Sequence, residues 1–163
     1  MRLVVEDRRR WVLPMLLRER AQELGDAPFL SFAVDEATAT FAEADERSDR
    51  LAAGLAQLGV GRGDRVLVMA GNRLEFVLTW FALNKLGAFH APVNTDYRGE
   101  FLEHVANTAQ ARLMVVERRY VDVVLASVAG MPFLEELIVI GDAEGVDGGR
   151  LRVHAFESVF SDD

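Results

Sequence analysis

Three polar side chains, those of Asn72, His90 and Arg98, stand where the sequence pattern could present them to a ligand. Asn72 follows the almost wholly apolar run of residues 65–70 and precedes a helical pattern. This places it at the carboxyl end of a predicted strand, where open sheets bind ligands. The same asparagine suits a helix N-cap, because Glu75 three residues later completes a capping signature. We predict the capping role and keep a ligand contact as the alternative.

His90 and Arg98 allow a similar choice between chemistry and ordinary structure. His90 lies in the otherwise apolar residues 88–93, so its ring either packs against a helix or projects toward a crevice. We predict a core histidine with satisfied hydrogen bonds, because buried polar groups are nearly always paired. Arg98 stands at the start of a predicted helix, whose positive N-terminus favours an anion or acidic neighbour beside the arginine. A solvated guanidinium is the simpler interpretation.

Composition and spacing exclude most other chemistry, so we predict no catalytic, cofactor-binding or metal-binding residue. The sequence has no cysteine, which removes disulfides, thiolate zinc sites and cysteine nucleophiles. Its three histidines are too scattered for a metal motif. Gly59, Gly61 and Gly63 are similar to a phosphate-binding loop, but they close a helix and lead into a strand, which is the wrong order. Glu135 and Glu136 are predicted only to precede a strand.

The chain is acidic, with 18 Lys and Arg against 26 Asp and Glu, a net charge of -8. Nucleic acid is therefore excluded as the main partner, because gripping its backbone requires clustered positive charge. The 163 residues, half of them hydrophobic, predict one domain or a compact piece of a larger protein. No apolar run approaches the roughly 20 residues that span a bilayer. Residues 1–10 carry both charge signs and no apolar stretch follows, which predicts a flexible arm and a cytoplasmic protein.

The first elements are a helix and a small hairpin. The helix begins near Pro14 and ends at Gly25, and the hairpin joins residues 29–34 to residues 38–41. A second helix follows a capping box formed by Thr40 and Glu43, and it closes at Gly59.

The rest of the chain alternates between strands and helices. The predicted strands are residues 65–70, 88–93, 112–116 and 137–140, with helices at 72–87, 99–108 and 120–129 between them. Right-handed crossovers place these strands in a mainly parallel, doubly wound sheet flanked by helices, an α/β fold. Trp80 and Phe81 are predicted in the core, because the apolar residues of their helix cover more than one stripe. Residues 151–160 are predicted as a loop and a further short element.

Over residues 14–160 the sequence resembles the N-terminal part of the adenylate-forming, or AMP-binding, enzymes, which include acyl-CoA synthetases, peptide-synthetase adenylation domains and luciferases. Residues 40–52 are the most specific piece, similar to the family's Thr-Tyr-x-Glu-Leu and Ser-Asn-Arg-Leu-Ala segments. Further matches follow in the family's order: Gly59-Val60, Gly63-Asp64-Arg65-Val66, Asn72 with Glu75-Phe76, Lys85-Leu86-Gly87-Ala88 and Pro92-Val93-Asn94. Asn94-Thr95 and residues 98–102 look most like the carnitine and crotonobetaine CoA ligases.

The resemblance implies an acid–CoA ligase that uses ATP, Mg and CoA, with a carboxylic acid as substrate. Phe41, Ala44 and Asp49 replace the commoner Tyr, Leu and Asn, which are tolerable packing changes. The family's phosphate loop ending in Pro-Lys-Gly, its Thr-Glu pair, its ribose-binding Asp and its catalytic Lys do not occur in these residues. No catalytic residue can therefore be carried over.

The chain is consequently expected to be an N-terminal portion, residues 1–163, that is inactive alone and binds no cofactor by itself. Its expected partner is the missing remainder of the synthetase, or a second copy of itself. A non-catalytic binding or interaction module on the same scaffold is the alternative, because one fold can host unrelated functions.

Overall fold

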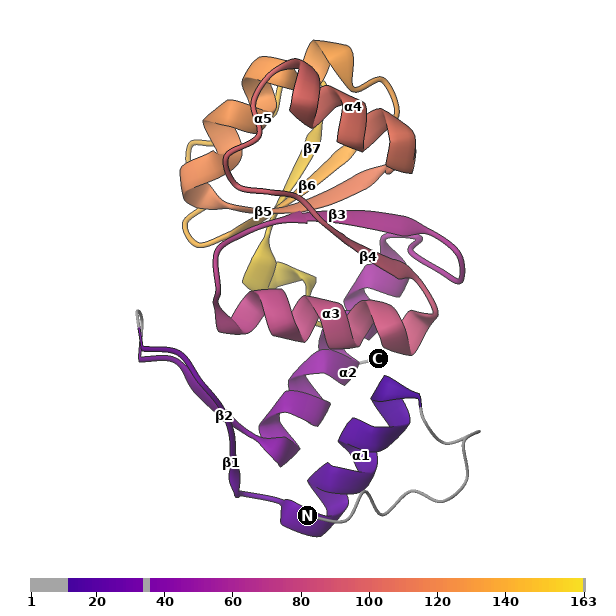
Figure 1. The fold of residues 1–163 in the computed structure, drawn as a ribbon, viewed down its shortest axis with the longest axis vertical. Coiled ribbons are helices and arrows are strands. Elements are labelled where there is room, and N and C mark those ends of the chain that lie inside the picture. Colours follow the sequence, from indigo (N-terminus) through magenta and orange to yellow (C-terminus); the bar gives the residue numbers. More distant parts are fainter. Residues whose placement is uncertain (1–11, 34–35, 163) are drawn as a thin grey trace.

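A five-stranded parallel sheet forms the centre of the computed structural model, which describes residues 12–33 and 36–162 (Figure 1). Its strands are β3 (Arg65–Met69), β4 (Phe89–Pro92), β5 (Leu113–Glu117), β6 (Glu136–Ile140) and β7 (Arg152–Ala155), in the order β4-β3-β5-β6-β7. Every neighbouring pair is parallel. The predicted parallel α/β sheet is confirmed, and β7 adds a fifth strand where only a short element was predicted. The predicted arm at residues 1–10 lies outside the described residues.

Two helical layers cover the sheet because its central strands are apolar on both faces. Val66 and Val68 face the layer of α2 (Phe41–Gln57) and α3 (Leu74–Leu86). Leu67 and Met69, which alternate with them, face the layer of α4 (Glu100–Ala109) and α5 (Val121–Ser127) (Figure 1). Short 3-10 turns at η2 (Arg118–Tyr120), η3 (Val128–Gly130) and η4 (Phe156–Val159) complete the connections. The fold is therefore doubly wound, as predicted.

Ahead of the sheet, the chain forms the predicted helix and hairpin. Helix α1 (Leu13–Leu24) has Pro14 in its first turn and ends at Gly25, whose φ is +50°. Strands β1 (Pro28–Ser31) and β2 (Thr38–Thr40) pair antiparallel. Helix α1 packs through Leu17 against Phe81, so this part is joined to the sheet by way of α3.

Helix α2 begins at the predicted capping box. The Glu43 N–H donates to Thr40 Oγ1 at 3.2 Å, and the Thr40 N–H donates to Glu43 Oε2 at 2.8 Å. The helix ends before Gly59, whose φ of +82° provides the left-handed residue that the sequence predicted there.

An ion-pair group around the buried Lys85 ammonium holds α1, α2 and α3 together. The Lys85 ammonium, in a side chain that is 8% exposed, lies 2.7 Å from Asp45 Oδ1 and 2.8 Å from Asp49 Oδ1. Arg18 of α1 contacts the other Asp49 oxygen at 2.7 Å, and these carboxylates raise the pKa of its guanidinium. The three helices are thus fixed to one another by charge as well as by apolar contact.

The prediction for Trp80 and Phe81 is half right. Phe81 is 4% exposed, whereas Trp80 is 42% exposed. Consecutive helical residues point about 100° apart, so both cannot face the same neighbour. Phe81 takes the direction toward α1, and Trp80 is left at the surface. The core placement of Trp80 was therefore wrong.

No helix in the described part of the chain is both long and apolar enough to cross a membrane. The cytoplasmic location stays a prediction.

We expect Phe81→Ala to lower the free energy of unfolding by about 3 to 5 kcal/mol, because it empties a buried aromatic site. Trp80→Ala is the matched control on the same helix, and its cost is expected to stay below about 1 kcal/mol. Denaturant unfolding followed by circular dichroism measures both. Equal losses for the two variants would contradict this assignment of surface and core.

Gly54 of α2 yields a second prediction, because a Cβ there would lie 1.4 Å from the backbone oxygen of Val159 in η4. Alanine improves helix propensity by about 1 kcal/mol over glycine, but here it must displace backbone. We expect Gly54→Ala to destabilise the fold by about 2 kcal/mol in thermal or denaturant unfolding.

The exposed Ala56, on the same helix, provides the control. Ala56→Gly should cost about 1 kcal/mol through propensity alone. A Gly54→Ala protein more stable than the parent would show that η4 does not hold this position against α2.

Candidate functional site

The carboxyl edge of the sheet, between β3 and β5, is the natural place for a ligand in this fold. From β3 the chain crosses to β4 on one side, whereas from β5 it crosses to β6 on the other. Connections that leave in opposite directions open a crevice at the carboxyl ends of the two strands. The residues that border it are those just after β3 and those at the end of β5.

The Glu117 carboxylate already occupies this crevice. Glu117 ends β5, and its Oε2 accepts the Gly71 N–H at 2.9 Å. Arg119 lies 2.9 Å from Oε1 through its Nε, and Arg73 lies 3.5 Å from the same oxygen through Nη1. The Glu117 side chain is 14% exposed. A backbone donor at the switch point, which could hold a ligand anion, is thus bound to a side-chain anion from the neighbouring strand.

A second carboxylate completes this group, which we call the Glu117 clamp: Arg73, Glu75, Glu117 and Arg119. Arg73 donates to both oxygens of Glu75, at 2.7 Å from Nε and 2.8 Å from Nη2. Bidentate pairs of this kind are among the stronger polar contacts in proteins. The clamp carries two positive and two negative side chains, so it joins β3, α3 and β5 without surplus charge.

Asn72 is not the N-cap of α3, contrary to the prediction. The helix begins at Leu74, its N-cap is Arg73, and no side chain caps it. Counted from the N-cap Arg73, Glu75 is the second helical residue and lies one position before the N3 site of a capping box; its carboxylate binds Arg73 instead. The Asn72 residue is exposed at the crevice, and its contact with a ligand stays a prediction.

His90 packs against α3 as a half-buried residue of β4. Its ring meets that of Phe76 edge-on, with centroids 4.8 Å apart. Burial without a compensating partner lowers the pKa of His90 from 6.5 to about 4. Its Nε2 is buried and has no hydrogen-bond partner among the described residues. The predicted packing against a helix is confirmed, but the predicted satisfied hydrogen bonding is wrong.

Arg98 turns back onto its own loop. Its exposed guanidinium donates from Nη1 to the carbonyl oxygens of Thr95, at 2.6 Å, and Tyr97, at 2.8 Å. The N-cap of α4 is Gly99, with a φ of +49°. The three predicted residues are thus not gathered into one site, because His90 lies within β4 on the α3 side and Arg98 is engaged before α4. An anion contact at Arg98 stays a prediction.

The sequence analysis missed the Glu117 clamp. Glu117 directly follows the apolar residues 113–116, as Asn72 nearly follows the apolar residues 66–70. Carboxyl ends of adjacent parallel strands meet at one edge, so this shared position was the available signal. The strand order, which places β5 beside β3, is not visible in the sequence.

A buried carboxylate at the opposite, amino edge was missed as well. Glu136 begins β6 and is 2% exposed; Arg152 Nη2 lies 2.7 Å from Oε1 and His154 Nε2 lies 2.8 Å from Oε2. Burial acts to raise its pKa, but hydrogen bonds from Arg152, His154 and Arg112 hold the pKa below its usual value. The group lies away from the edge where such sheets bind ligands, so its role is to join β5, β6 and β7.

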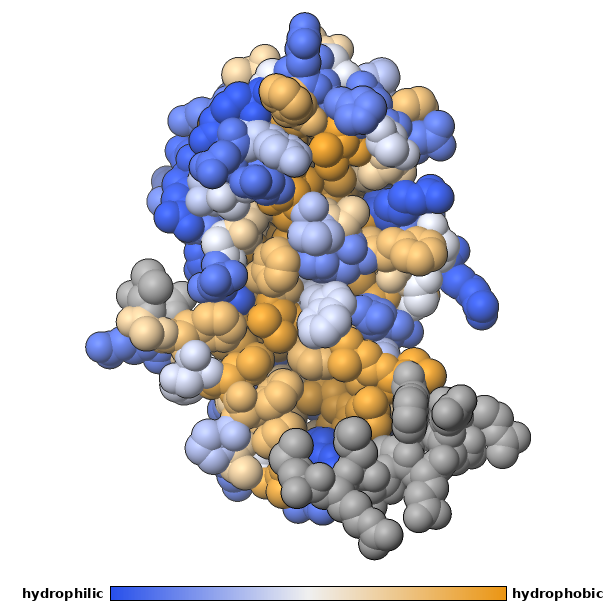
Figure 2. Space-filling view, viewed as in Figure 1, coloured by the Kyte–Doolittle hydropathy of each residue, from blue (hydrophilic) through white to orange (hydrophobic). Residues whose placement is uncertain are grey.

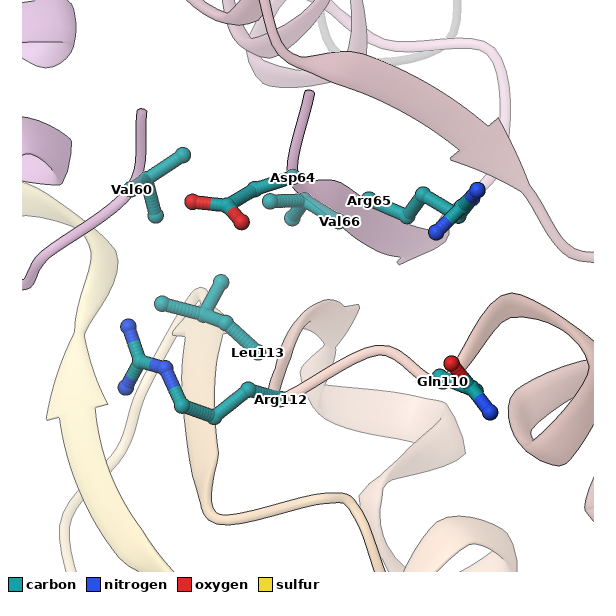
Figure 3. Close-up of a pocket in the computed structure, with 7 residues that line it drawn as sticks. All are labelled: Val60, Asp64, Arg65, Val66, Gln110, Arg112 and Leu113. Carbon is teal, nitrogen blue, oxygen red and sulfur yellow. The ribbon is translucent and has the colours of Figure 1, made fainter. Parts of the chain in front are cut away.

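A small pocket beside this carboxylate fits no cofactor of nucleotide size. Figure 3 shows it between Asp64, just before β3, and Arg112, just before β5. Its volume is about 60 Å³, whereas ligand pockets typically measure about 300 to 1,000 Å³. Asp64 Oδ2 accepts the Gly61 N–H, and Arg112 donates to the Leu58 carbonyl oxygen. Within residues 12–33 and 36–162, no group of three or more acidic or histidine side chains could hold a metal ion.

The doubly wound sheet with this N-terminal helix and hairpin is shared with a known class. A family model for the AMP-binding enzymes matches residues 17–156, which is most of the chain. The chain belongs to the AMP-binding enzyme family.

Two curated relatives and one solved structure show the extent of the likeness. The chain is 39% identical over 103 residues to 4-coumarate–CoA ligase 2 of Oryza sativa subsp. japonica, covering 63% of this chain and 18% of that protein. It is 33% identical over 134 residues to 2,3-dihydroxybenzoate-AMP ligase of Bacillus subtilis (strain 168), covering 79% and 24%. The apo structure of Mycobacterium smegmatis MbtA matches with a TM-score of 0.73 and 30% identity, covering 91% and 27%. The chain spans about a quarter or less of these curated relatives.

The His90 environment predicts a pH dependence of stability. The pKa of His90 is about 4 in the folded chain and 6.5 ordinarily. Between pH 4 and pH 6.5, His90 is therefore protonated in the unfolded chain but neutral in the folded chain. The neutral ring's contribution is complete above pH 6.5 and is lost as the pH falls toward 4. One pKa unit corresponds to about 1.4 kcal/mol, and partial solvent exposure reduces the total to about 1 to 2 kcal/mol.

His90→Phe is therefore expected to flatten the dependence of unfolding free energy on pH between 7 and 5. The exposed His104→Gln serves as the control and should leave the slope unchanged. Urea unfolding at several pH values measures the slopes. The lowered pKa of Glu136 acts below pH 4.5, outside this window. Parallel curves for the parent and His90→Phe would contradict the proposed environment.

Proposed function

We propose that this chain is an N-terminal structural segment of an ATP-dependent acid–CoA ligase, and that it forms no acyl-adenylate by itself. The family match over residues 17–156 and the greater length of the relatives support the assignment. The Glu117 clamp supports the lack of independent activity. Its Glu117 carboxylate binds the Gly71 N–H at the carboxyl edge between β3 and β5, where this sheet would otherwise receive a phosphate group.

The complete reaction makes demands that this segment does not meet. A carboxylate oxygen attacks the α-phosphorus of ATP and pyrophosphate leaves; the CoA thiol then attacks the acyl carbon and AMP leaves. Both steps need positioned reactants and cationic groups that neutralise the phosphates. At the described carboxyl edge, Arg73 and Arg119 are already paired with carboxylates. This edge therefore does not fit an ATP–Mg complex, and its role is to support surfaces that other segments complete.

A carboxylic acid is the proposed substrate class of the complete enzyme. The finer likeness to carnitine and crotonobetaine CoA ligases depends on Asn94-Thr95 and residues 98–102. These residues form the loop after β4 and the first turn of α4, next to the carboxyl edge. In the proposal they border the acyl-binding and CoA-facing surface of the complete ligase.

Exposed aromatic residues favour a second candidate function, that of a non-catalytic interaction module. Phe101 is 75% exposed and Phe89 is 59% exposed, which suits contact with another polypeptide. The two functions differ in one respect: a module on this scaffold would carry out its role without the catalytic segments of a ligase.

Carboxylate-dependent exchange of labelled pyrophosphate into ATP tests the proposal. The purified 163-residue chain, with Mg and a panel of aromatic, short-chain and long-chain acids, is expected to give no exchange above the protein-free blank. The B. subtilis 2,3-dihydroxybenzoate-AMP ligase, assayed with 2,3-dihydroxybenzoate, is the positive control. Exchange by the chain that disappears on Arg119→Ala or Arg98→Ala would show that this segment is catalytic and that the proposal is wrong.

A further inference from the structure

Lys85 is the one lysine of the chain, and its ammonium lies against α2 with its side chain 8% exposed. Its three acceptors are the Asp45 carbonyl oxygen at 2.8 Å, Asp45 Oδ1 at 2.7 Å and Asp49 Oδ1 at 2.8 Å. An ammonium has three N–H donors and no lone pair, so in this arrangement the nitrogen cannot act as a nucleophile. With α1 in place, the only side-chain amine of the chain is therefore shielded.

A pocket lies beside Lys85 along the N-terminal half of α1. It is lined by Pro14, Met15 and Arg18 of α1 together with Asp49 and Lys85, and its volume is about 260 Å³. A water molecule takes up about 30 Å³ of the liquid, so the pocket has room for a small organic group. Because α1 forms most of its wall, movement of α1 would open the pocket and expose Lys85.

Helix α1 is held to the rest of the fold by few contacts. Leu17 is the one buried residue of its twelve, and no side chain caps its N-terminus. Met15 and Leu24 are 44% and 41% exposed, and Figure 2 shows apolar residues gathered at the surface of the half of the molecule that contains α1 and α3. Elements with few buried apolar contacts open locally, at a lower cost than global unfolding.

The two ends of α1 are fixed differently. At the C-terminal end, the Gly25 carbonyl oxygen accepts the Ala42 N–H at 3.0 Å, and the φ of Gly25 is +50°. Closer to the N-terminal end the polar anchor is Arg18, whose Nη2 donates to both Asp49 oxygens, at 2.9 and 2.7 Å. An opening that pivots at Gly25 would carry the α1 wall of the pocket away from Lys85.

We propose that Lys85 is an acylation site that becomes reactive when α1 opens. Its reagent is an acyl phosphate, a mixed anhydride of a carboxylic and a phosphoric acid. The inference does not depend on the proposed function, because it concerns the 163-residue chain and any anhydride of this class.

The reaction is an ordinary acyl transfer to an amine. After the ammonium has given one proton to the Asp49 carboxylate, the nitrogen lone pair attacks the acyl carbon. A C–N bond forms, the bond from that carbon to the phosphate oxygen breaks, and phosphate leaves with its electron pair. A second proton then passes from the nitrogen to water, which leaves a neutral amide.

Acylation would remove the charge that joins α3 to α2. The amide carries one N–H in place of three and no charge, so it cannot replace the ammonium between Asp45 and Asp49. A carboxylate that loses a buried partner is left partly uncompensated. Acylation of Lys85 would thus convert a transient opening of α1 into a lasting loss of the joint between α2 and α3.

Acetylation of the intact chain by acetyl phosphate tests the site, with Lys85 occupancy followed over time by mass spectrometry. The rate in concentrated urea gives the reactivity of Lys85 in the unfolded chain. In buffer, Lys85 is expected to react measurably, but at least about a hundredfold more slowly. Leu17→Ala, which removes the buried anchor of α1, and Arg18→Gln, which removes its ion pairs, should each speed the reaction by about tenfold or more.

Arg20→Gln is the matched control on α1, because Arg20 pairs with Glu23 of the same helix. Gly54→Ala is the control for global unfolding, because Gly54 packs against η4. Each should change the rate by less than about twofold. Circular dichroism of each variant shows that folding is retained, and the Arg18→Gln rate alone is sufficient if Leu17→Ala unfolds.

Three results would overturn the inference. Equal rates in buffer and in urea would show that the fold does not shield Lys85. An absence of Lys85 acetylation in the folded parent and in both α1 variants would show that opening of α1 does not expose it. Equal acceleration by Gly54→Ala and the α1 variants would assign the reaction to global unfolding.

Discussion

The central strands β3, β5 and β6 are apolar on both faces, and this constraint determines most of the architecture. Such strands are stable only between two layers, so the connections from β3 to β4, from β4 to β5 and from β5 to β6 each contain a helix that crosses one face or the other. Val66 and Leu67, neighbours in sequence, accordingly belong to different halves of the core. The chain leaves β3 to one side of the sheet and leaves β5 to the other. The crevice closed by Glu117 is a consequence of that divergence.

Charged side chains fix the geometry that apolar packing leaves open. Lys85 with Asp45 and Asp49 joins helices, whereas Glu136 with Arg152 joins strands. Each group connects residues far apart in the sequence, and losing one partner of a buried pair leaves the other uncompensated. These contacts therefore specify which helix lies against which more than they add to net stability. In this acidic chain, basic side chains such as Lys85 and Arg152 thus lie where secondary-structure elements meet.

The sequence predicted elements whose signals are local. The capping box at Thr40 and the left-handed glycine after α2 depend only on neighbouring residues, and both are present. The predictions were less accurate where contacts with other residues determine the local structure. Asn72 does not cap α3, and the Glu75 carboxylate binds the neighbouring Arg73 instead. Trp80 shares its helix with core residues, but it contacts Phe81 from the surface side and stays 42% exposed. Strand β7, with Arg152 and His154 in its pattern, lacks the apolar run that marks the inner strands, because it pairs with the buried Glu136.

The close approach of Gly54 to Val159 affects how such a chain acquires its structure during synthesis. Helix α2 is complete by residue 57, yet the apolar face around Leu51 and Leu55 is closed by Phe156 and Val159, about a hundred residues later. Contacts this distant in sequence slow folding, because a long loop must close before they form. On the ribosome, the part of α2 around Gly54 therefore stays uncovered until residues 156–159 have emerged, even after α3 has packed against the rest of the helix. A chaperone that shields this part of α2 would have to act during that interval.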